Sequence, residues 1–466
     1  MPELYLVEEN WTMNMKLLKG NGMSLQRFEI TETRPTPLLS DFEIFLGYLR
    51  ANSISLTPKK LFLKKKYLYE LNKKMYFRIS RVSENSNQDR YPLLHLFYHL
   101  VLSGKLFQID YRRRSRRVLE PTDRLQLYER LNWTEKYFFL LETFWMDVNW
   151  RKLQGGYFGY SPIRHIPWLL DFLSKCQPGK KIQLRKCNVW MDRIFAHTFA
   201  FLEYFLLYFA YFGFWHATLE NPSYGNDVPK RWCQPESIRP TKFGVMMASI
   251  LKEARPILSW NLPYRREIDQ HRIFPDNIIP TEYFFLGNGE EDYKLPDNRP
   301  SSKRTDNPKE PFFKAFTPLF PEHVLRQTLS RDTTQFEDGI YTFKVALGRK
   351  IWRRIKIAAD NTLEDLHLII QEAFSFDNAH LYSFFLDGVR WSFDRISCPE
   401  EGEGISADEV QIGELGLSIG QDILYLFDYG DEWCFSVQLE HVDKKKFGSN
   451  QPQIVARRGE SPPQYG

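Results

Sequence analysis

Apolar residues follow two different patterns along the chain. Up to about residue 286 they form long stretches of helical length, such as residues 93–103 and 202–212. From residue 339 they alternate with polar residues over short runs, beginning with Tyr341, Phe343 and Val345, as expected for half-buried strands. The first pattern predicts a mainly helical region, and the second predicts a region of short strands.

One helix is expected among the C-terminal strands. Residues 363–374 place apolar side chains on one face, and Thr362 and Asp365 have the spacing of a capping box. Strands 341–347 and 351–357 precede this helix. After it, Asp387-Gly388 is a hairpin turn between 381–386 and 389–393, and 423–429 pairs with 433–439. The order β-β-α-β-β-β-β predicts a compact α+β domain.

Residues 93–131 and 202–251 repeat one pattern. In each, an apolar helix closes at a glycine, Gly104 or Gly213, and an aromatic strand follows. After a loop of different length, a second strand enters a Pro-Thr pair that suits the start of another helix. This order is that of a winged-helix unit, and a repeat that takes up an insertion in a loop is typical of tandem modules. We therefore expect two winged-helix-like modules.

The composition changes sharply at residues 287–311. This segment holds four prolines and two glycines and has almost no apolar side chains, which is typical of a linker or a long exposed loop. We expect four parts: residues 1–130 with the first module, 131–286 with the second, the linker 287–311, and the α+β domain 312–466.

Residues 194–215 are apolar enough to raise the question of a membrane span. Glu203 lies near the middle of this stretch, where a carboxylate is costly in lipid, so a buried helix is favoured over a span. The N-terminus lacks the pattern of a secretory signal, and none of the five cysteines forms a C-x-x-C pair. These features indicate a cytoplasmic protein without a membrane partner.

The overall composition conceals a division of charge. Aromatic residues make up 16% of the chain, which excludes a mainly disordered protein. The net charge of +5 combines +9 in residues 1–130, +5 in 131–330 and −9 in 331–466. A basic N-terminal part joined to an acidic C-terminal part is informative about partners, although the two ends could equally attract each other.

Two basic clusters are candidates for contacts with nucleic-acid phosphates. One is the expected hairpin tip of the first module, and the other interleaves lysines with apolar residues upstream. Charge runs are often only solvated faces, and this alternative has nearly equal weight. The helix before the hairpin is too apolar to read base edges, so any contact is expected with phosphates. The candidates are Lys59, Lys60, Lys64, Lys65, Lys66, Arg112, Arg113, Arg114, Arg116 and Arg117.

A metal site in the C-terminal domain is a weaker hypothesis. His380, Asp428 and Asp431, with Glu440 or His441, could share a cation. The favoured alternative is that Asp428 and Asp431 build a tight turn. The chain has no P-loop, G-x-G-x-x-G, H-E-x-x-H or G-x-S-x-G motif, so no cofactor is expected and an enzyme is not favoured.

The C-terminal part resembles a known family. The segments YTFKVALGRKIWRRIKI, TLEDLHLIIQEAFSFDNAHLYSF, YLFDYGDEWCFSVQLE and RGESPPQYG occur in the order and spacing of plasmid pRiA4b ORF-3-like proteins. The resemblance spans about residues 339–466 and implies a domain without an assigned activity, found on prokaryotic plasmids, mobile elements and chromosomes. Many members have Glu-His after the hairpin tryptophan. Cys434 and Phe435 stand there in this chain, which weakens any site that needs that histidine.

Three functional hypotheses follow. The first is a non-enzymatic interaction protein linked to plasmids or mobile elements, which binds DNA or RNA through its basic N-terminal region and possesses an acidic C-terminal domain suited to a protein partner. The second is a metal-dependent enzyme that uses His380, Asp428 and Asp431. The third is a protein-binding scaffold in which the acidic domain docks on the basic one.

Overall fold

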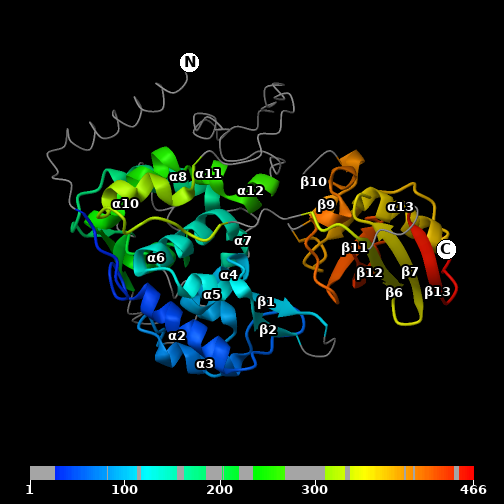
Figure 1. Cartoon of the computed structure of the whole chain (residues 1–466), viewed down its shortest axis with the longest axis horizontal. Helices are drawn as coiled ribbons and strands as arrows, with labels where there is room; N and C mark the ends of the chain where they lie inside the picture. Colours follow the sequence, from blue (N-terminus) through cyan, green and yellow to red (C-terminus); the bar gives the residue numbers. More distant parts are fainter. Residues whose placement is uncertain are drawn as a thin grey trace, which may run out of the picture.

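The computed structural model describes residues 27–80, 82–112, 117–154, 162–184, 202, 204–219, 235–267, 310–330, 336–392, 395–401, 405–444 and 451–465. It consists of an N-terminal body built mainly of helices and a C-terminal domain built on a sheet (Figure 1). This arrangement confirms the expected α+β class.

The first half of the N-terminal body contains four helices and a hairpin. After the first helix, Ser55 forms an isolated β-bridge to Val118 of the hairpin. The elements are α2 (Leu38–Ala51), α3 (Lys65–Lys74), α4 (Pro92–Ser103), β1 (Phe107–Asp110), β2 (Val118–Pro121) and α5 (Asp123–Glu129).

The second half begins with α6, whose first turn is closed by a capping box between Asn132 and Glu135. Residues 204–211 are helical and precede the second hairpin. The other elements are α6 (Trp133–Glu142), a π-helical turn (Thr143–Asp147), α7 (Trp150–Leu153), α8 (Ile166–Ser174), β3 (Ile182–Gln183), β4 (Trp215–Leu219), β5 (Pro235–Pro240), α10 (Lys242–Ala254), α11 (Ile257–Trp260), α12 (Leu262–Glu267) and the 3₁₀ segment η5 (Phe312–Leu319).

The two halves have related arrangements. In the first, β2 pairs with β1, and Ser55 forms an isolated bridge to Val118 of β2. In the second, β3 pairs with β5, which pairs with β4. In both, the last strand also contacts a segment that comes earlier in the chain, and a helix follows each hairpin. The expected helix–strand–strand–helix order is present in both copies, while their assignment to the winged-helix class stays a prediction.

The same hydrogen bonds close both hairpins. Thr122 Oγ1 donates to the Lys105 carbonyl at 2.5 Å, and Thr241 Oγ1 donates to the Gly213 carbonyl at 2.7 Å. Lys105, rather than Gly104, is therefore the equivalent of Gly213. Both have a left-handed backbone, with φ of 55° and 84°.

Gly104 has a different role from the helix-closing one expected for it. Its φ of −75° is helical. A Cβ at this position would lie 2.9 Å from the Phe139 ring, so glycine is needed for close packing of α4 against α6.

One hydrophobic core extends from Ile30 to Leu325. It draws on both expected modules, so residues 1–130 and 131–286 are not separated by a boundary in packing. It also takes in Phe312, Phe316 and Phe320 at the start of the segment that we assign to the C-terminal domain from the sequence. The expected linker 287–311 lies outside the described residues, except for Glu310 and Pro311.

The described part of the apolar stretch 194–215 lies within this core. Residues 204–212 and Trp215 are buried, and the Tyr208 hydroxyl donates to the Leu153 carbonyl at 2.9 Å. Among the described residues, no helix has the length and apolar character needed to cross a membrane.

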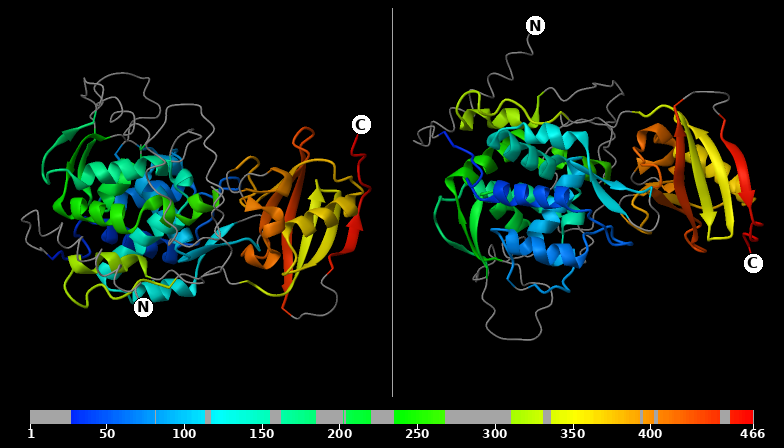
Figure 2. Two further views of the ribbon diagram at one scale, coloured as in Figure 1. Left: turned by 90° about the horizontal axis from the view of Figure 1, so that it is seen from above. Right: turned by 60° about the horizontal axis from the view of Figure 1, so that its bottom comes forward.

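The C-terminal domain is an eight-stranded sheet with the order β10-β9-β8-β11-β12-β6-β7-β13. Only the short pair β9–β10 is parallel. Helix α13 covers one face (Figure 2), and its buried Leu366, Ile370 and Phe374 pack in a separate core with Phe343 and Tyr425. The elements are β6 (Ile340–Leu347), β7 (Ile351–Ala358), α13 (Leu363–Phe374), β8 (Tyr382–Phe385), β9 (Arg395–Ser397), β10 (Ile405–Ser406), β11 (Asp422–Phe427), β12 (Trp433–Asp443) and β13 (Gln453–Arg458).

The predicted strand at 389–393 is wrong for residues 389–392, and residue 393 lies outside the described residues. The Asp387 carboxylate accepts hydrogen bonds from the Val389 N–H at 3.1 Å and the Ser392 hydroxyl at 2.8 Å, which curls this segment into a loop. The next strand along the chain, β9, begins at Arg395 and pairs with β8. Strands β10 and β13 are additional to the predicted order. The capping box at Thr362 and the β11–β12 hairpin are confirmed.

Candidate nucleic-acid interface and histidine–carboxylate cluster

The predicted lysines lie around the start of α3. Lys59 and Lys60 are exposed on the turn between Leu56 and Leu63, which form an isolated β-bridge. Lys64 is the N-cap of α3, and Lys65 and Lys66 are exposed in its first turn. The five lysines thus lie on the turn before α3, at its N-cap and in its first turn, and we call this set the lysine face.

Helix α3 has the two-sided character that its sequence predicts. Tyr67, Leu68 and Leu71 are buried against the body. The Lys66 ammonium lies 4.7 Å from the centre of the Tyr67 ring, and Lys73 lies 4.0 Å from that of Tyr69. Lys66 and Lys73 are exposed, and both ammonium groups keep their charge, because an aromatic ring attracts a cation without neutralising it.

Few carboxylates oppose this positive charge. Glu70 on the same helix accepts a hydrogen bond from the Tyr48 hydroxyl at 2.7 Å and pairs with Lys74 at 3.4 Å. The Tyr48 hydrogen bond and the Lys74 ammonium hold the pKa of Glu70 below its usual range. Within the described part of the chain, no carboxylate lies within ion-pair distance of the five lysines of the lysine face.

The arginines of the first hairpin are in a different situation. Arg112 pairs with Asp110 at 2.8 Å and Glu120 at 3.1 Å, and Asp110 raises the pKa of the Arg112 guanidinium. Arg117 is directed to Asp422 of the C-terminal domain at 3.1 Å. These two arginines therefore already have carboxylate partners. Arg113, Arg114 and Arg116 lie outside the described residues.

Helix α4, which precedes the hairpin, does not offer a face for reading bases. Six of its apolar side chains are buried, and His95 is fixed between Gln88 and the Lys152 carbonyl, 2.8 Å from its Nε2. Burial lowers the pKa of His95 to about 4, so this imidazole is neutral at physiological pH. This burial agrees with the expectation that any nucleic-acid contact would be to phosphates.

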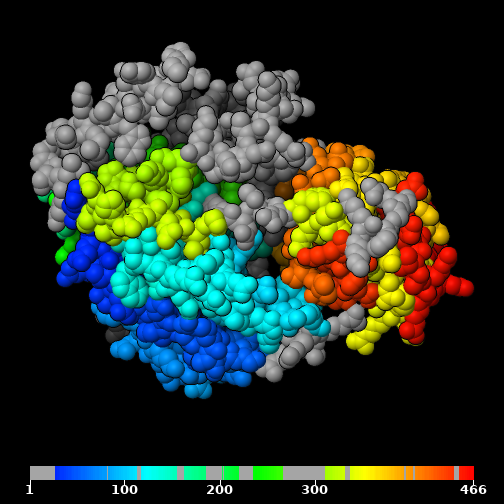
Figure 3. All heavy atoms as spheres, viewed as in Figure 1, coloured from blue at the N-terminus to red at the C-terminus, as the bar shows by residue number. Residues whose placement is uncertain are grey.

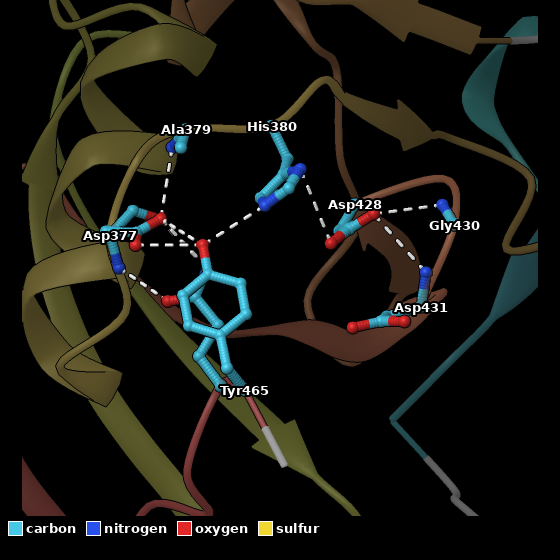
Figure 4. Close-up of polar contacts among 8 residues, drawn as sticks. Asp377, Ala379, His380, Asp428, Gly430, Asp431 and Tyr465 are labelled. Carbon is cyan, nitrogen blue, oxygen red and sulfur yellow. Dashed lines mark hydrogen bonds and ion pairs between the residues drawn. The ribbon is translucent and has the colours of Figure 1, made fainter.

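The metal candidates His380, Asp428 and Asp431 lie in one network of polar contacts (Figure 4). Asp428 Oδ1 accepts hydrogen bonds from the Gly430 N–H at 2.9 Å and the Asp431 N–H at 3.3 Å, and Asp428 itself has a left-handed φ of 56°. Its other oxygen lies 3.5 Å from His380 Nδ1. Asp431 thus takes part through its backbone, as the turn interpretation predicts.

The remaining partner of His380 is the C-terminal segment. His380 Nε2 lies 3.1 Å from the Tyr465 hydroxyl, which donates to Asp377 at 2.8 Å. The hydrogen bond to Asp377 raises the pKa of Tyr465, which is opposite to what an activated tyrosine nucleophile needs.

A buried arginine, Arg353, anchors residues 458–461, which precede Tyr465 in the same C-terminal segment. Arg353 donates to the carbonyls of Ala373, Arg458 and Gly459, and to the Ser461 hydroxyl at 2.7 Å. This network gives the closing residues of the domain a structural role.

The other metal candidates lie elsewhere. Glu440 pairs with Arg354 at 2.6 Å, and His441 is on β12 opposite Thr342. No group of three or more His, Cys, Asp or Glu side chains in the described ranges is arranged to hold a metal ion.

Sequence reasoning missed Lys73, which extends the basic surface along α3, and Asp422, the partner of Arg117. The helical spacing of three residues from Lys66 to Tyr69 and four from Tyr69 to Lys73 could have indicated the first. No local signal indicated the second, because residues 117 and 422 are brought together only by the packing of the two parts.

Comparisons with known proteins concern the C-terminal part. Residues 339–465 match the family described as plasmid pRiA4b ORF-3-like protein, which confirms the expected resemblance for this domain. The uncharacterized protein y4hQ of Sinorhizobium fredii (strain NBRC 101917 / NGR234) is 30% identical over 122 residues, which cover 24% of this chain and 58% of that protein. The chain therefore spans little more than half the length of this curated relative.

Among solved structures, a protein of unknown function, MM3350 from Methanosarcina mazei Go1, is similar. It shares 25% sequence identity, with 28% of this chain and 74% of that chain covered and a TM-score of 0.24. The names of these similar proteins state no activity.

Proposed function

We propose that this protein binds nucleic acid without sequence preference, through phosphate contacts made by the lysine face. The observation that carries the proposal is the set of five clustered lysines with no carboxylate at ion-pair distance among the described residues. Unpaired cations on a folded surface attract phosphates and release their counterions, which favours binding.

Two further features support phosphate contacts over base contacts. The first backbone N–H groups of a helix have no partners within the helix, and Lys64 at the N-cap of α3 provides no side-chain hydrogen bond to them. Helix α4, which would enter the groove in a base-reading module, is buried. An association with plasmids or mobile elements is part of this proposal, and the name of the matching family, plasmid pRiA4b ORF-3-like protein, supports the association with plasmids.

Location in the cytoplasm is also part of the proposal. Of the described cysteines, Cys176, Cys398 and Cys434 are free thiols, which suits a reducing compartment.

The test is salt-dependent binding to a short DNA duplex of mixed sequence, measured by fluorescence anisotropy. K65E/K66E is expected to weaken binding and to reduce the slope of log affinity against log salt by about 2, because two phosphate contacts are lost. The matched control is K180E/K181E, which makes the same charge change at exposed lysines before β3. Equal effects of the two variants, or no binding by the unmodified protein at low salt, would overturn the proposal.

A further inference from the structure

The hairpin of the first module contacts the C-terminal domain. Strands β1 and β2 reach toward that domain in Figures 1 and 2, and the space-filling view in Figure 3 shows their atoms extending to it. The backbones touch closely, because a Cβ on Gly420 would lie 2.5 Å from the Tyr111 carbonyl oxygen. We call Tyr111, Arg117, Gly420 and Asp422 the docking contact.

Arg117 is the central group of the docking contact. Its side chain is only 15% exposed, and its guanidinium donates to the Tyr111 carbonyl, lies 5.0 Å from the centre of the Tyr111 ring and reaches Asp422 at 3.1 Å. The Ser436 hydroxyl also donates to Asp422 at 3.3 Å. Burial at this contact raises the pKa of Tyr111. The arginine is thus held by one neighbour from each part of the molecule.

A second ion pair joins the same two parts. Lys152 of α7 lies 3.7 Å from Asp387 in the loop after β8. In both pairs, the cation belongs to the helical body and the carboxylate belongs to the acidic domain. A phosphate oxygen could replace each carboxylate, since carboxylates and phosphates are both anionic acceptors of charge-assisted hydrogen bonds.

The docking contact also adjoins the lysine face. The Leu56 N–H donates to the Arg117 carbonyl at 2.9 Å, and Leu56 leads directly into the turn that carries Lys59 and Lys60. A phosphate backbone that lies along the lysine face would therefore meet Arg117 next, if Asp422 were absent. The docked domain removes this cation and brings residues with a net charge of −9 close to the same surface.

We propose that the C-terminal domain is a built-in competitor for the anion-binding surface of the first module. Its carboxylates occupy Arg117 and Lys152 in the closed form, and nucleic acid binds more tightly once the domain undocks. This inference rests on the proposed function, because it concerns access to the same surface. Ion pairs that remain partly exposed are modest and screened by salt, so the docking contact is reversible. By linkage, nucleic acid must weaken docking as much as docking weakens nucleic-acid binding.

The test compares two charge-matched variants of the full chain. D422K/D387K reverses both carboxylates of the contact. The control E372K/E460K makes the same change at exposed residues on α13 and after β13. Small-angle X-ray scattering reports undocking as a larger radius of gyration, and anisotropy with the short DNA duplex reports affinity. We expect D422K/D387K to be more expanded than the control and to bind the duplex about tenfold more tightly at equal salt.

The charge swap R117D/D422R supplies the second arm. It is expected to restore the compact radius that the single change R117D loses, because the ion pair is re-formed with opposite polarity. A swap variant as expanded as R117D, or a compact D422K/D387K, would overturn the docking role of the pair. Expansion of D422K/D387K without tighter binding than the control would overturn the competition and leave the proposed function standing. Absence of duplex binding by every variant and by the unmodified protein would overturn both proposals.

Discussion

At the scale of single residues, His367 shows how the fold fixes a charge state. It lies on α13, with Nδ1 2.6 Å from the Tyr425 hydroxyl, and its ring is stacked on Tyr382 at 3.7 Å. Burial lowers the pKa of His367 to about 4, although the Asn378 hydrogen bond opposes this shift. The apolar pattern of 363–374 predicted the helix and its core face. It could not predict that His367 is buried in that core, because the hydrogen-bond partner of its ring, Tyr425, is far away in sequence.

This shift makes the domain acid-sensitive. An unfolded histidine binds a proton near pH 6.5 and the buried one near pH 4, so the unfolded state holds more protons between these values. The contribution is fully present above pH 6.5 and is lost as the pH falls toward 4, by about 3 kcal/mol. Chemical denaturation at a series of pH values should show a shallower loss in H367Q, although this variant is less stable at neutral pH. Parallel pH profiles for the two proteins would contradict this assignment.

At the scale of elements, the repeat could be recognised from the sequence, but the sequence did not show which residues of the two copies are equivalent. The glycine, aromatic strand and Pro-Thr pair predicted the helix and hairpin order in both copies, since turn and cap residues act locally. The equivalence of Lys105 and Gly213 could not be predicted, because it is defined by the hydrogen bonds of Thr122 and Thr241 across each hairpin. Likewise, the side-chain hydrogen bonds of Asp387 turned a strand-like segment into a loop.

Because Lys105 and Gly213 occupy equivalent left-handed positions, we expect substitutions at the two positions to change the stability of the protein in opposite directions. A left-handed backbone costs a non-glycine residue about 1–2 kcal/mol, and glycine costs about 0.5–1 kcal/mol in unfolded-state entropy. K105G should therefore stabilise the protein by about 0.5 kcal/mol, since Lys105 is exposed. G213A should destabilise it by more than about 1 kcal/mol, because the added Cβ would also lie 2.7 Å from the Pro35 ring. Urea denaturation measures both, and destabilisation by K105G would refute the equivalence.

At the scale of the whole molecule, the lysine face illustrates what a sequence can and cannot reveal. Alternation of lysines with Leu63, Tyr67 and Leu68 predicted a basic face on an amphipathic element, and the structure places it there. The composition also indicated a basic part and an acidic part. Which arginine meets which carboxylate is a property of tertiary packing, so neither the Arg117–Asp422 pair nor the sharing of one core by both modules was predictable.

The distribution of core residues predicts how the chain divides into folding units. One core joins residues 30–325 and a second joins residues 341–454, so we predict two folding units. A fragment of residues 336–466 should unfold cooperatively on its own. A fragment of residues 1–130 should not, because Tyr128 and Phe77 would lose their ring contacts with Phe139 and Tyr211 of the second half of the body.

Circular dichroism during thermal unfolding tests both fragments, with residues 1–330 as the control that keeps the first core whole. The full chain should show two transitions, and the one matched by fragment 336–466 should be the only one whose pH dependence changes in H367Q. Cooperative unfolding of fragment 1–130 would instead mean that the first module is stable alone and that its packing against the second half adds little free energy. Aromatic contacts between the two halves argue against that outcome. Tyr128 of the first module packs against Phe139 of α6, with ring centres 5.3 Å apart, and Phe77 packs against Tyr211 at 4.8 Å.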